Sequence, residues 1–343
     1  MKSRWIAVLI SAAIVAVFLA GSVAAPRPAL AQEKIRFLLN WIPYGLHTGF
    51  YTALERGYYK EAGFDITIDR GYGSSDTAKK IGGGVGDFGF SGFPAVTLGR
   101  ARDVKIKLLG VILDRGTHAI FALKGKGITK PSDLVGRTIG APTASVLRVS
   151  FPALAKANNF NPSAVKWVNM PGSALVPALI SEKVDSVATF ATIQHKIEAR
   201  AKAAGKEAIT ILYSEHGVDL YSVGLIATDQ RIENNPKQVR RFVEASMKGV
   251  AWAVENPEQG VADLIKTHSA LNAKLERTTW RIVTDHMLTP YQRTHGLGQI
   301  SRAKAQRTRD IVLEGHKIKK DIPVEDLYTN RFLPKLFPRR IAW

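Results

Sequence analysis

Short apolar runs alternate with amphipathic stretches along most of the chain. The run 35–39 predicts a strand, and a helix with apolar residues at helical spacing begins near Thr48. Gly63 ends this helix, and residues 64–68 alternate as the next strand. The pattern predicts a strand, helix, strand unit with a parallel crossover.

Polar and aromatic residues follow the first predicted strand. Asn40, Trp41 and Tyr44 come directly after it, and His47 stands where the helix opens. In open α/β sheets, ligands collect where strands end at their carboxyl edge. We therefore expect Asn40, Trp41 and His47 to contact a ligand, although packing or helix capping would also explain Trp41 and His47.

The same alternation recurs further along the chain. Strands are predicted at 106–113 and 119–123, with a passage between two domains in the intervening segment. A second α/β series follows to residue 212, and 222–227 predicts a strand that crosses back. From Asn235 onward the pattern is helical only. About 310 residues after the leader are enough for two domains, each with its own core.

The first residues have the pattern of a secretory leader. Lys2 and Arg4 precede an apolar run that Gly21 interrupts, and small residues at 29–31 fit a signal peptidase site. We expect cleavage before Gln32 and export to the periplasm, with no stable membrane insertion afterwards. A retained anchor is the alternative, because the apolar run could extend toward spanning length.

Composition narrows the candidate functions. The chain has no cysteine, so thiolate metal sites and disulfides are excluded, and its histidines lack ligand spacing, so we expect no metal. The formal net charge of +19 falls to +16 once Lys2, Arg4 and Arg27 are removed with the leader. The basic residues are spread along the chain without a nucleic-acid module. A generally basic surface is the better interpretation, and we expect no nucleic-acid partner.

Two glycine-rich stretches do not carry enzyme motifs. The glycines at 82–86 lack the following Lys-Ser or Lys-Thr of a phosphate-binding loop. The run 89–93 resembles a nucleophile elbow, but Phe93 stands where the second required glycine should be. Neither stretch therefore supports a nucleotide hydrolase or an α/β-hydrolase.

Three segments carry a family resemblance. They are Trp41-Ile42-Pro43 with His47-Thr48-Gly49-Phe50-Tyr51, then Gly57-Tyr58-Tyr59-Lys60-Glu61-Ala62-Gly63, and then Gly86-Asp87-Phe88-Gly89. Together they resemble the substrate-binding proteins of nitrate, sulfonate and taurine transporters. Within that group the chain is similar to the NMT1/THI5-like branch, which includes the yeast thiamin-pyrimidine synthase. The resemblance extends over nearly the whole mature chain.

The resemblance implies a type II periplasmic binding protein, an α/β fold with two lobes joined by a two-strand hinge. Lobe one would comprise residues 32–117 and 228–343, with the C-terminal helices packed on it, and lobe two residues 118–227 with the hinge strands. Residues 1–31 would be the signal peptide. The implied partners are a small-molecule ligand and an ABC permease with its ATPase. We expect a monomer without a cofactor.

The synthase relatives make an enzyme the alternative of another class. In their pattern a cofactor-bearing lysine ends the strand 87–91 and a reactive histidine follows shortly after. Here the corresponding positions hold Ser91 and Ala95, and the cysteine cluster of the synthases is missing. The resemblance therefore favours a binding protein without chemistry of its own.

The resemblance favours a thiamin pyrimidine precursor, an aminopyrimidine, as the ligand. A neutral heteroaromatic ring gains from flat apolar walls and a few fixed polar groups. The residues expected to supply these, all at strand ends or turns, are Asn40, Trp41, His47, Ser74, Ser91, Phe93, Ser145, Phe190 and Tyr221.

The segment after Phe190 departs from the pyrimidine-binding pattern. The acidic residue of the relatives is absent there, and the nearest acid is Glu198. A sulfonate, nitrate or flavin-like aromatic ligand therefore stays open, with hydroxyls and helix starts such as that near Ser74 as the binding groups for an anion. A plain capped turn is an equal explanation for the stretch 70–76.

Overall fold

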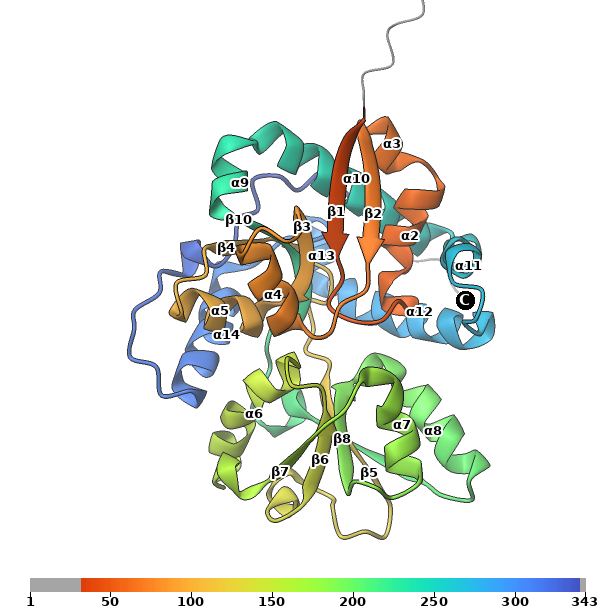
Figure 1. The fold of residues 1–343 in the computed structure, drawn as a ribbon, viewed down its shortest axis with the longest axis vertical. Coiled ribbons are helices and arrows are strands. Elements are labelled where there is room, and N and C mark those ends of the chain that lie inside the picture. Colours follow the sequence, from red (N-terminus) through yellow and green to blue (C-terminus); the bar gives the residue numbers. More distant parts are fainter. Residues whose placement is uncertain (1–31, 340–343) are drawn as a thin grey trace, which may run out of the picture.

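The computed structural model describes residues 32–339, which form two α/β lobes placed one above the other (Figure 1). The predicted leader and its cleavage site lie outside the described residues. Within 32–339, no helix is long and apolar enough to cross a membrane.

The upper lobe contains a five-stranded mixed sheet in the order β2-β1-β3-β10-β4. Its strands are β1 (Glu33–Leu38), β2 (Phe64–Asp69), β3 (Phe88–Gly92), β4 (Ile106–Val111) and β10 (Val223–Thr228). β1 pairs in parallel with β2 over six residues, which confirms the predicted crossover. β10 runs antiparallel to both β3 and β4.

The first crossover helix is interrupted, which the sequence pattern did not predict. A single helix was expected from about Thr48 to Gly63, but α2 (Thr48–Glu55) and α3 (Tyr58–Glu61) are separate. Gly57 lies between them with φ +74°, a left-handed conformation that suits glycine and breaks the helix. The other helices that precede β4 are a short 3-10 turn (Gly45–His47), α4 (Ser74–Gly82) and α5 (Phe93–Ala101).

The lower lobe holds a second five-stranded sheet, in the order β7-β6-β8-β5-β9. Its strands are β5 (His118–Leu123), β6 (Thr138–Ala141), β7 (Lys166–Asn169), β8 (Ser186–Phe190) and β9 (Ala208–Leu212). The helices α6 (Val146–Ala157), α7 (Gly172–Ile180) and α8 (Gln194–Ala203) cover it. Every strand predicted for this domain forms, with bounds shifted by at most one residue.

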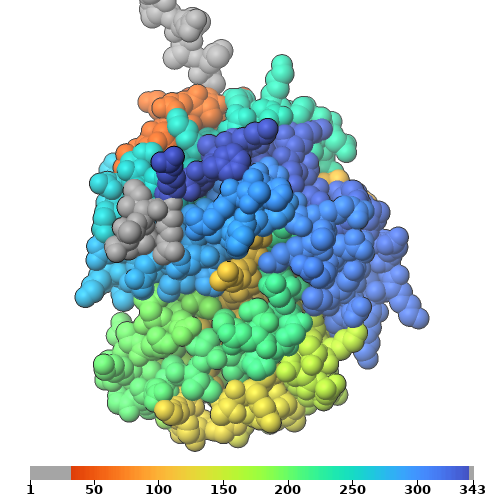
Figure 2. Space-filling model, turned by 180° about the vertical axis from the view of Figure 1, so that it is seen from behind, coloured from red at the N-terminus to blue at the C-terminus, as the bar shows by residue number. Residues whose placement is uncertain are grey.

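The C-terminal part of the chain is helical and returns to the upper lobe, where its blue segments cover the back (Figure 2). Its helices are α9 (Asp229–Asn234), α10 (Pro236–Glu255), α11 (Pro257–Thr267), α12 (Ala273–Met287), α13 (Pro290–His295) and α14 (Arg302–Gly315). The predicted apolar stripe of α10 is buried. Phe242 from this stripe stacks on Phe88 of β3 with ring centroids 3.8 Å apart, so the helix is held on the sheet by aromatic packing.

The chain passes between the two sheets twice, after β4 and before β10. Thr117 in the first passage is hydrogen-bonded to Ser222 in the second, with oxygens 3.1 Å apart. β10, which we expected to be the strand that crosses back, lies wholly in the upper sheet. The predicted lobe boundaries stay a proposal, and the two adjacent passages are where a hinge between the lobes would lie.

Candidate functional site

A cavity lies between the two lobes, where the carboxyl ends of strands from both sheets meet helix starts. It is lined by Asn40, Trp41, Gly73, Ser74, Ser145, Val146, Leu147, Ala188, Thr189 and Phe190. In this conformation its volume is about 10 Å³, which is room for about one water molecule. The lobes are therefore closed over the site, and a larger ligand requires them to separate.

The structure brings five of the nine predicted ligand residues to this cavity. They are Asn40, Trp41, Ser74, Ser145 and Phe190. The four that do not line it are His47, Ser91, Phe93 and Tyr221, all fully buried. Ligand contact stays a prediction for all nine residues, and the cavity lining supports it for the first five.

His47 supports Asn40 from behind the cavity. The backbone N–H of Tyr44 donates to His47 Nδ1 (3.3 Å), so the neutral ring carries its proton on Nε2. Nε2 then donates to Asn40 Oδ1 (3.1 Å), which fixes the orientation of the amide. Burial lowers the pKa of His47 to about 3, so the ring stays neutral at physiological pH. The Asn40 Nδ2 group is left as a donor at the cavity.

Ser74 presents an unused hydroxyl at the first residue of α4. The residue is 2% exposed, and Ser74 Oγ has no hydrogen-bond partner among the described residues. Ser91 Oγ donates to the backbone oxygen of Ser74 (2.8 Å) and so supports the turn that carries this hydroxyl. An unpaired buried hydroxyl costs about 1–3 kcal/mol, a cost that a ligand group could offset.

The two helices that begin at the cavity come from different lobes. Ser145 is the N-cap of α6, and its Oγ accepts from the backbone N–H of Leu147 (3.2 Å). α4 begins at Ser74 in the other lobe. Helix N-termini carry partial positive charge, so together they favour a carbonyl oxygen or an anionic group at this point.

The lobes approach closely beside the cavity at Gly73. This residue has φ +129°, and a Cβ placed on it would lie 2.4 Å from the backbone oxygen of Ala144 in the lower lobe. The next contact is an interlobe hydrogen bond from Ser75 N to the same oxygen (3.1 Å). Glycine at 73 therefore permits the closed arrangement.

Two aromatic side chains form the flat walls of the cavity. Phe190 ends β8 and is 5% exposed. Trp41 packs across the gap onto Gly172 at the start of α7, where an added Cβ would lie 2.1 Å from Trp41 Cζ2. One wall thus belongs to the upper lobe and one to the lower lobe.

Phe93 and Tyr221 belong instead to the core of the upper lobe. Their rings stack with centroids 5.6 Å apart. Tyr221 Oη accepts from the backbone N–H of Ser301 in the C-terminal part (2.7 Å), so its polar end is also occupied. Strand-end position suggested a cleft role for both, but the C-terminal segment covers them.

The cavity lining contains no ionisable side chain. Its polar groups are one amide, three hydroxyls, the indole N–H and the backbone. Sequence reasoning missed Thr189, which precedes Phe190 in the same strand end, as well as Val146 and Leu147 at the start of α6. Within residues 32–339, no three metal-ligating side chains come together.

A buried ion pair joins the lobes on one side of the cleft. Lys196 Nζ of α8 lies 2.8 and 2.9 Å from the two carboxylate oxygens of Glu276 on α12. The Glu276 side chain is 3% exposed and that of Lys196 is 20% exposed. Glu276 also accepts from the backbone N–H of Gly45 (2.8 Å), the first residue of the 3-10 turn that leads into α2. We refer to Lys196 and Glu276 as the interlobe ion pair.

Comparisons with known proteins found a family, curated relatives and solved structures that this chain resembles. The family described as NMT1/THI5 like matches residues 45–260. The formylaminopyrimidine-binding protein of Halalkalibacterium halodurans is 25% identical over 266 residues, which cover 76% of this chain and 79% of that protein. The 4-amino-5-hydroxymethyl-2-methylpyrimidine phosphate synthase THI11 of Saccharomyces cerevisiae is 27% identical over 255 residues, 72% of this chain and 74% of the synthase.

Among solved structures, the alkanesulfonate-binding protein SsuA from Xanthomonas axonopodis pv. citri, bound to MOPS, has a TM-score of 0.64. The match covers 89% of this chain and 99% of that one at 12% identity, so it shows the shared fold.

Proposed function

The chain belongs to the NMT1/THI5-like family with the two-lobed α/β fold of periplasmic binding proteins, and from this premise we propose that it is the solute-binding component of an ABC importer. The observation that carries the proposal is the cavity between the lobes. It combines two aromatic walls from opposite lobes with fixed polar groups and no ionisable side chain. Closure of the lobes on a small ligand would complete it.

The ligand that best fits this lining is an aminopyrimidine, a precursor of the thiamin pyrimidine. A flat neutral ring would lie between Trp41 and Phe190, with Asn40 Nδ2 and Ser74 Oγ at its edge. Neutral ring nitrogens and an amino group match such donors and hydroxyls without a charged partner. The name of the Halalkalibacterium halodurans relative supports a formylaminopyrimidine in particular.

We propose that the protein is not an enzyme. General acid–base or Schiff-base chemistry requires an ionisable group at the ligand, and none lines the cavity. Ser91, at the position where the synthase pattern has its lysine, uses its hydroxyl to support Ser74. Ala95, at the histidine position, is buried in α5. A synthase remains the alternative of another class because of the synthase relatives.

The proposal includes location and partners. The protein would be exported, lose its leader before Gln32 and deliver ligand in the periplasm to a permease with its ATPase. N-terminal sequencing of the exported protein tests the cleavage site. An N-terminus other than Gln32 would contradict that part of the proposal without affecting the ligand site.

A second candidate ligand class rests on the two helix starts at the cavity. α4 and α6 both direct their N-termini to it, which would suit a sulfonate or nitrate. An anion would bind there without a charged counter-group, whereas the aromatic walls would contribute little. Trp41→Ala should therefore greatly weaken the binding of an aminopyrimidine and change the binding of an anion little.

The experiment is a thermal-shift screen of the mature protein against formylaminopyrimidine, 4-amino-5-hydroxymethyl-2-methylpyrimidine, riboflavin, taurine, octanesulfonate and nitrate. A ligand that binds only the folded state stabilises it by about 2.7 kcal/mol at one hundred times its Kd. We expect a shift with the aminopyrimidines that Trp41→Ala greatly reduces. A shift only with sulfonate or nitrate would reject the aminopyrimidine. Turnover of bound ligand, followed by mass spectrometry, would reject the binding-protein assignment.

A further inference from the structure

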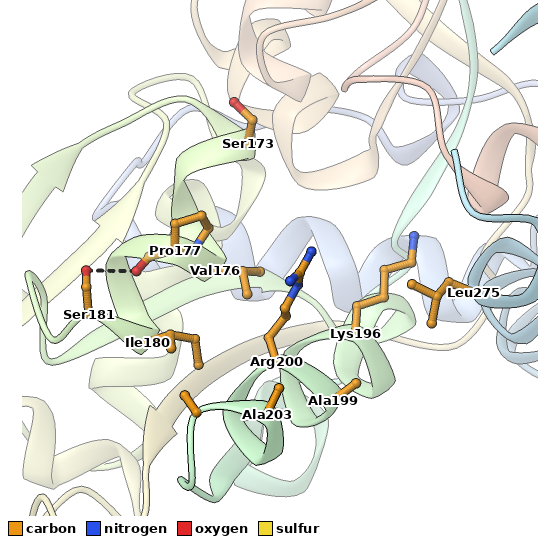
Figure 3. A pocket seen from close by; sticks show the side chains of 11 residues that line it. Ser173, Val176, Pro177, Ile180, Ser181, Lys196, Ala199, Arg200, Ala203 and Leu275 are labelled. Atoms are coloured by element: carbon orange, nitrogen blue, oxygen red, sulfur yellow. Dashed lines mark hydrogen bonds between the residues drawn. The ribbon is translucent and has the colours of Figure 1, made fainter. Parts of the chain in front are cut away.

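A large groove lies on the side of the lower lobe, between α7 and α8 (Figure 3). Its volume is about 940 Å³. Apolar side chains make up most of its wall, among them Val176 and Ile180 of α7 and Ala203 of α8. We call this the side groove. None of its lining residues lines the cavity between the lobes.

The side groove contains one unpaired positive charge. Arg200 of α8 projects toward Val176 across the groove (Figure 3). Its guanidinium makes no ion pair or hydrogen bond with any residue between 32 and 339, in contrast to the Lys196 ammonium, which pairs with Glu276. An apolar wall with one free guanidinium is complementary to a surface that carries apolar side chains and a carboxylate.

The side groove is assembled from both lobes. Leu275, at one end, belongs to α12 of the upper lobe, whereas the remaining lining comes from the lower lobe. Two interlobe contacts hold this end in place. His195 Nε2 lies 3.1 Å from the backbone oxygen of Leu275, and the interlobe ion pair follows at the next residue of each helix. The groove is therefore complete only while the lobes are closed.

From these observations we propose that the side groove docks a segment of the membrane permease that carries apolar side chains and a carboxylate to pair with Arg200. The inference rests on the proposed function. A permease must engage the closed, loaded protein in preference to the open one. A groove whose one end is closed by Leu275 of the other lobe changes shape there on opening, so docking at that end would report closure directly.

Photo-cross-linking in intact cells that carry the cognate transporter tests the proposal. A benzoylphenylalanine is placed at Ala203, an exposed residue of the groove, and in a matched protein at Lys202, the next residue of the same helix, which lies outside it. Adducts are identified by mass spectrometry. Arg200→Glu is then added to the Ala203 protein, and Lys202→Glu serves as its control because it changes the charge equally on the same helix.

The expected result is an adduct from position 203 with the importer's permease, at a segment that contains Asp or Glu, with at least fivefold higher yield than from position 202. Arg200→Glu should lower the yield at least tenfold, and Lys202→Glu should leave it within twofold. Equal yields from 202 and 203, an adduct with a second copy of this protein alone, or an unchanged yield in Arg200→Glu would overturn the proposal.

The melting shift with formylaminopyrimidine is measured on the same proteins, so that the two proposals fail separately. A ligand shift without a permease adduct rejects the side groove as a docking site and leaves the binding function intact. A permease adduct without a shift from any ligand in the screen rejects the ligand assignment and supports the docking site.

Discussion

The interlobe ion pair should stabilise the closed state, and Lys196→Met tests this directly. The substitution keeps most of the aliphatic length of the side chain but removes its charge. In the closed state the Glu276 side chain is 3% exposed, and the substitution removes its ammonium partner. The backbone N–H of Gly45 then still donates a hydrogen bond to the Glu276 carboxylate. In an open state water would solvate that carboxylate, so the cost applies mainly to closure.

The magnitude follows from the burial of the two partners. Removal of one partner from a fully buried pair costs about 3–5 kcal/mol, whereas exposed pairs contribute about 0.2–1 kcal/mol. Because Lys196 is 20% exposed, the effect should lie between these limits, at about 1–3 kcal/mol. At about 1.4 kcal/mol per tenfold change, ligand affinity should fall by about 5-fold to 150-fold.

Calorimetric titration with formylaminopyrimidine gives the affinities, and small-angle scattering with and without ligand reports closure. Glu276→Gln should weaken binding less than Lys196→Met, because the remaining ammonium is partly exposed and can be solvated. The double variant should be closer to the wild type than Lys196→Met, because no buried charge is left. Lys202→Met on the same helix is the matched control.

The reasoning would be refuted by a folded Lys196→Met protein that binds ligand with the wild-type Kd. It would also be refuted if the double variant lost as much affinity as the sum of the two single variants. Either result would mean that the pair does not contribute to closure through the burial of Glu276.

Three further predictions concern the cavity and the residues behind it. Ser74→Ala removes an unpaired buried hydroxyl, so the unliganded protein should be equally stable or up to about 1 kcal/mol more stable. The same substitution should weaken ligand binding. Chemical unfolding measures the change in stability, and titration with ligand measures the change in affinity. Gly73→Ala should weaken ligand binding at least tenfold, because the added Cβ clashes with Ala144 in the closed state. Gly84→Ala is the control: this glycine also has a positive φ but has open space around it, so its substitution should not weaken binding. Titration of both variants with ligand measures the two affinities. The pKa of His47 is about 3 in the folded protein against about 6.5 in the unfolded chain, so the stability that the neutral ring contributes is full above pH 6.5 and is lost as the pH falls toward 3. At pH 5 the loss in the free energy of unfolding is about 2 kcal/mol. His47→Gln should reduce the fall in the free energy of unfolding between pH 7 and pH 5 by that amount.

The sequence alone determined the order of strands and helices, because side-chain periodicity is a local property. The strands Thr138–Ala141 and Ser186–Phe190 form with the predicted bounds. The rule that ligands collect at strand ends pointed to Asn40 and Trp41 after β1 and to Phe190 at the end of β8, and these strand ends of two different sheets meet at one cavity. The family motifs indicated the two-lobed fold.

Only the tertiary structure decided which strand-end residues face the cavity and which are covered. Tyr221 reaches Ser301, and Lys196 reaches Glu276, each across 80 residues of chain. No local sequence pattern specifies such pairs, because the residues around each partner show only the periodicity of its own helix or strand. Their meeting depends on how the C-terminal helices return to the upper lobe and how the lobes close. Periodicity shows which residues face the interior, whereas contact between distant segments is fixed by the packing of the whole chain.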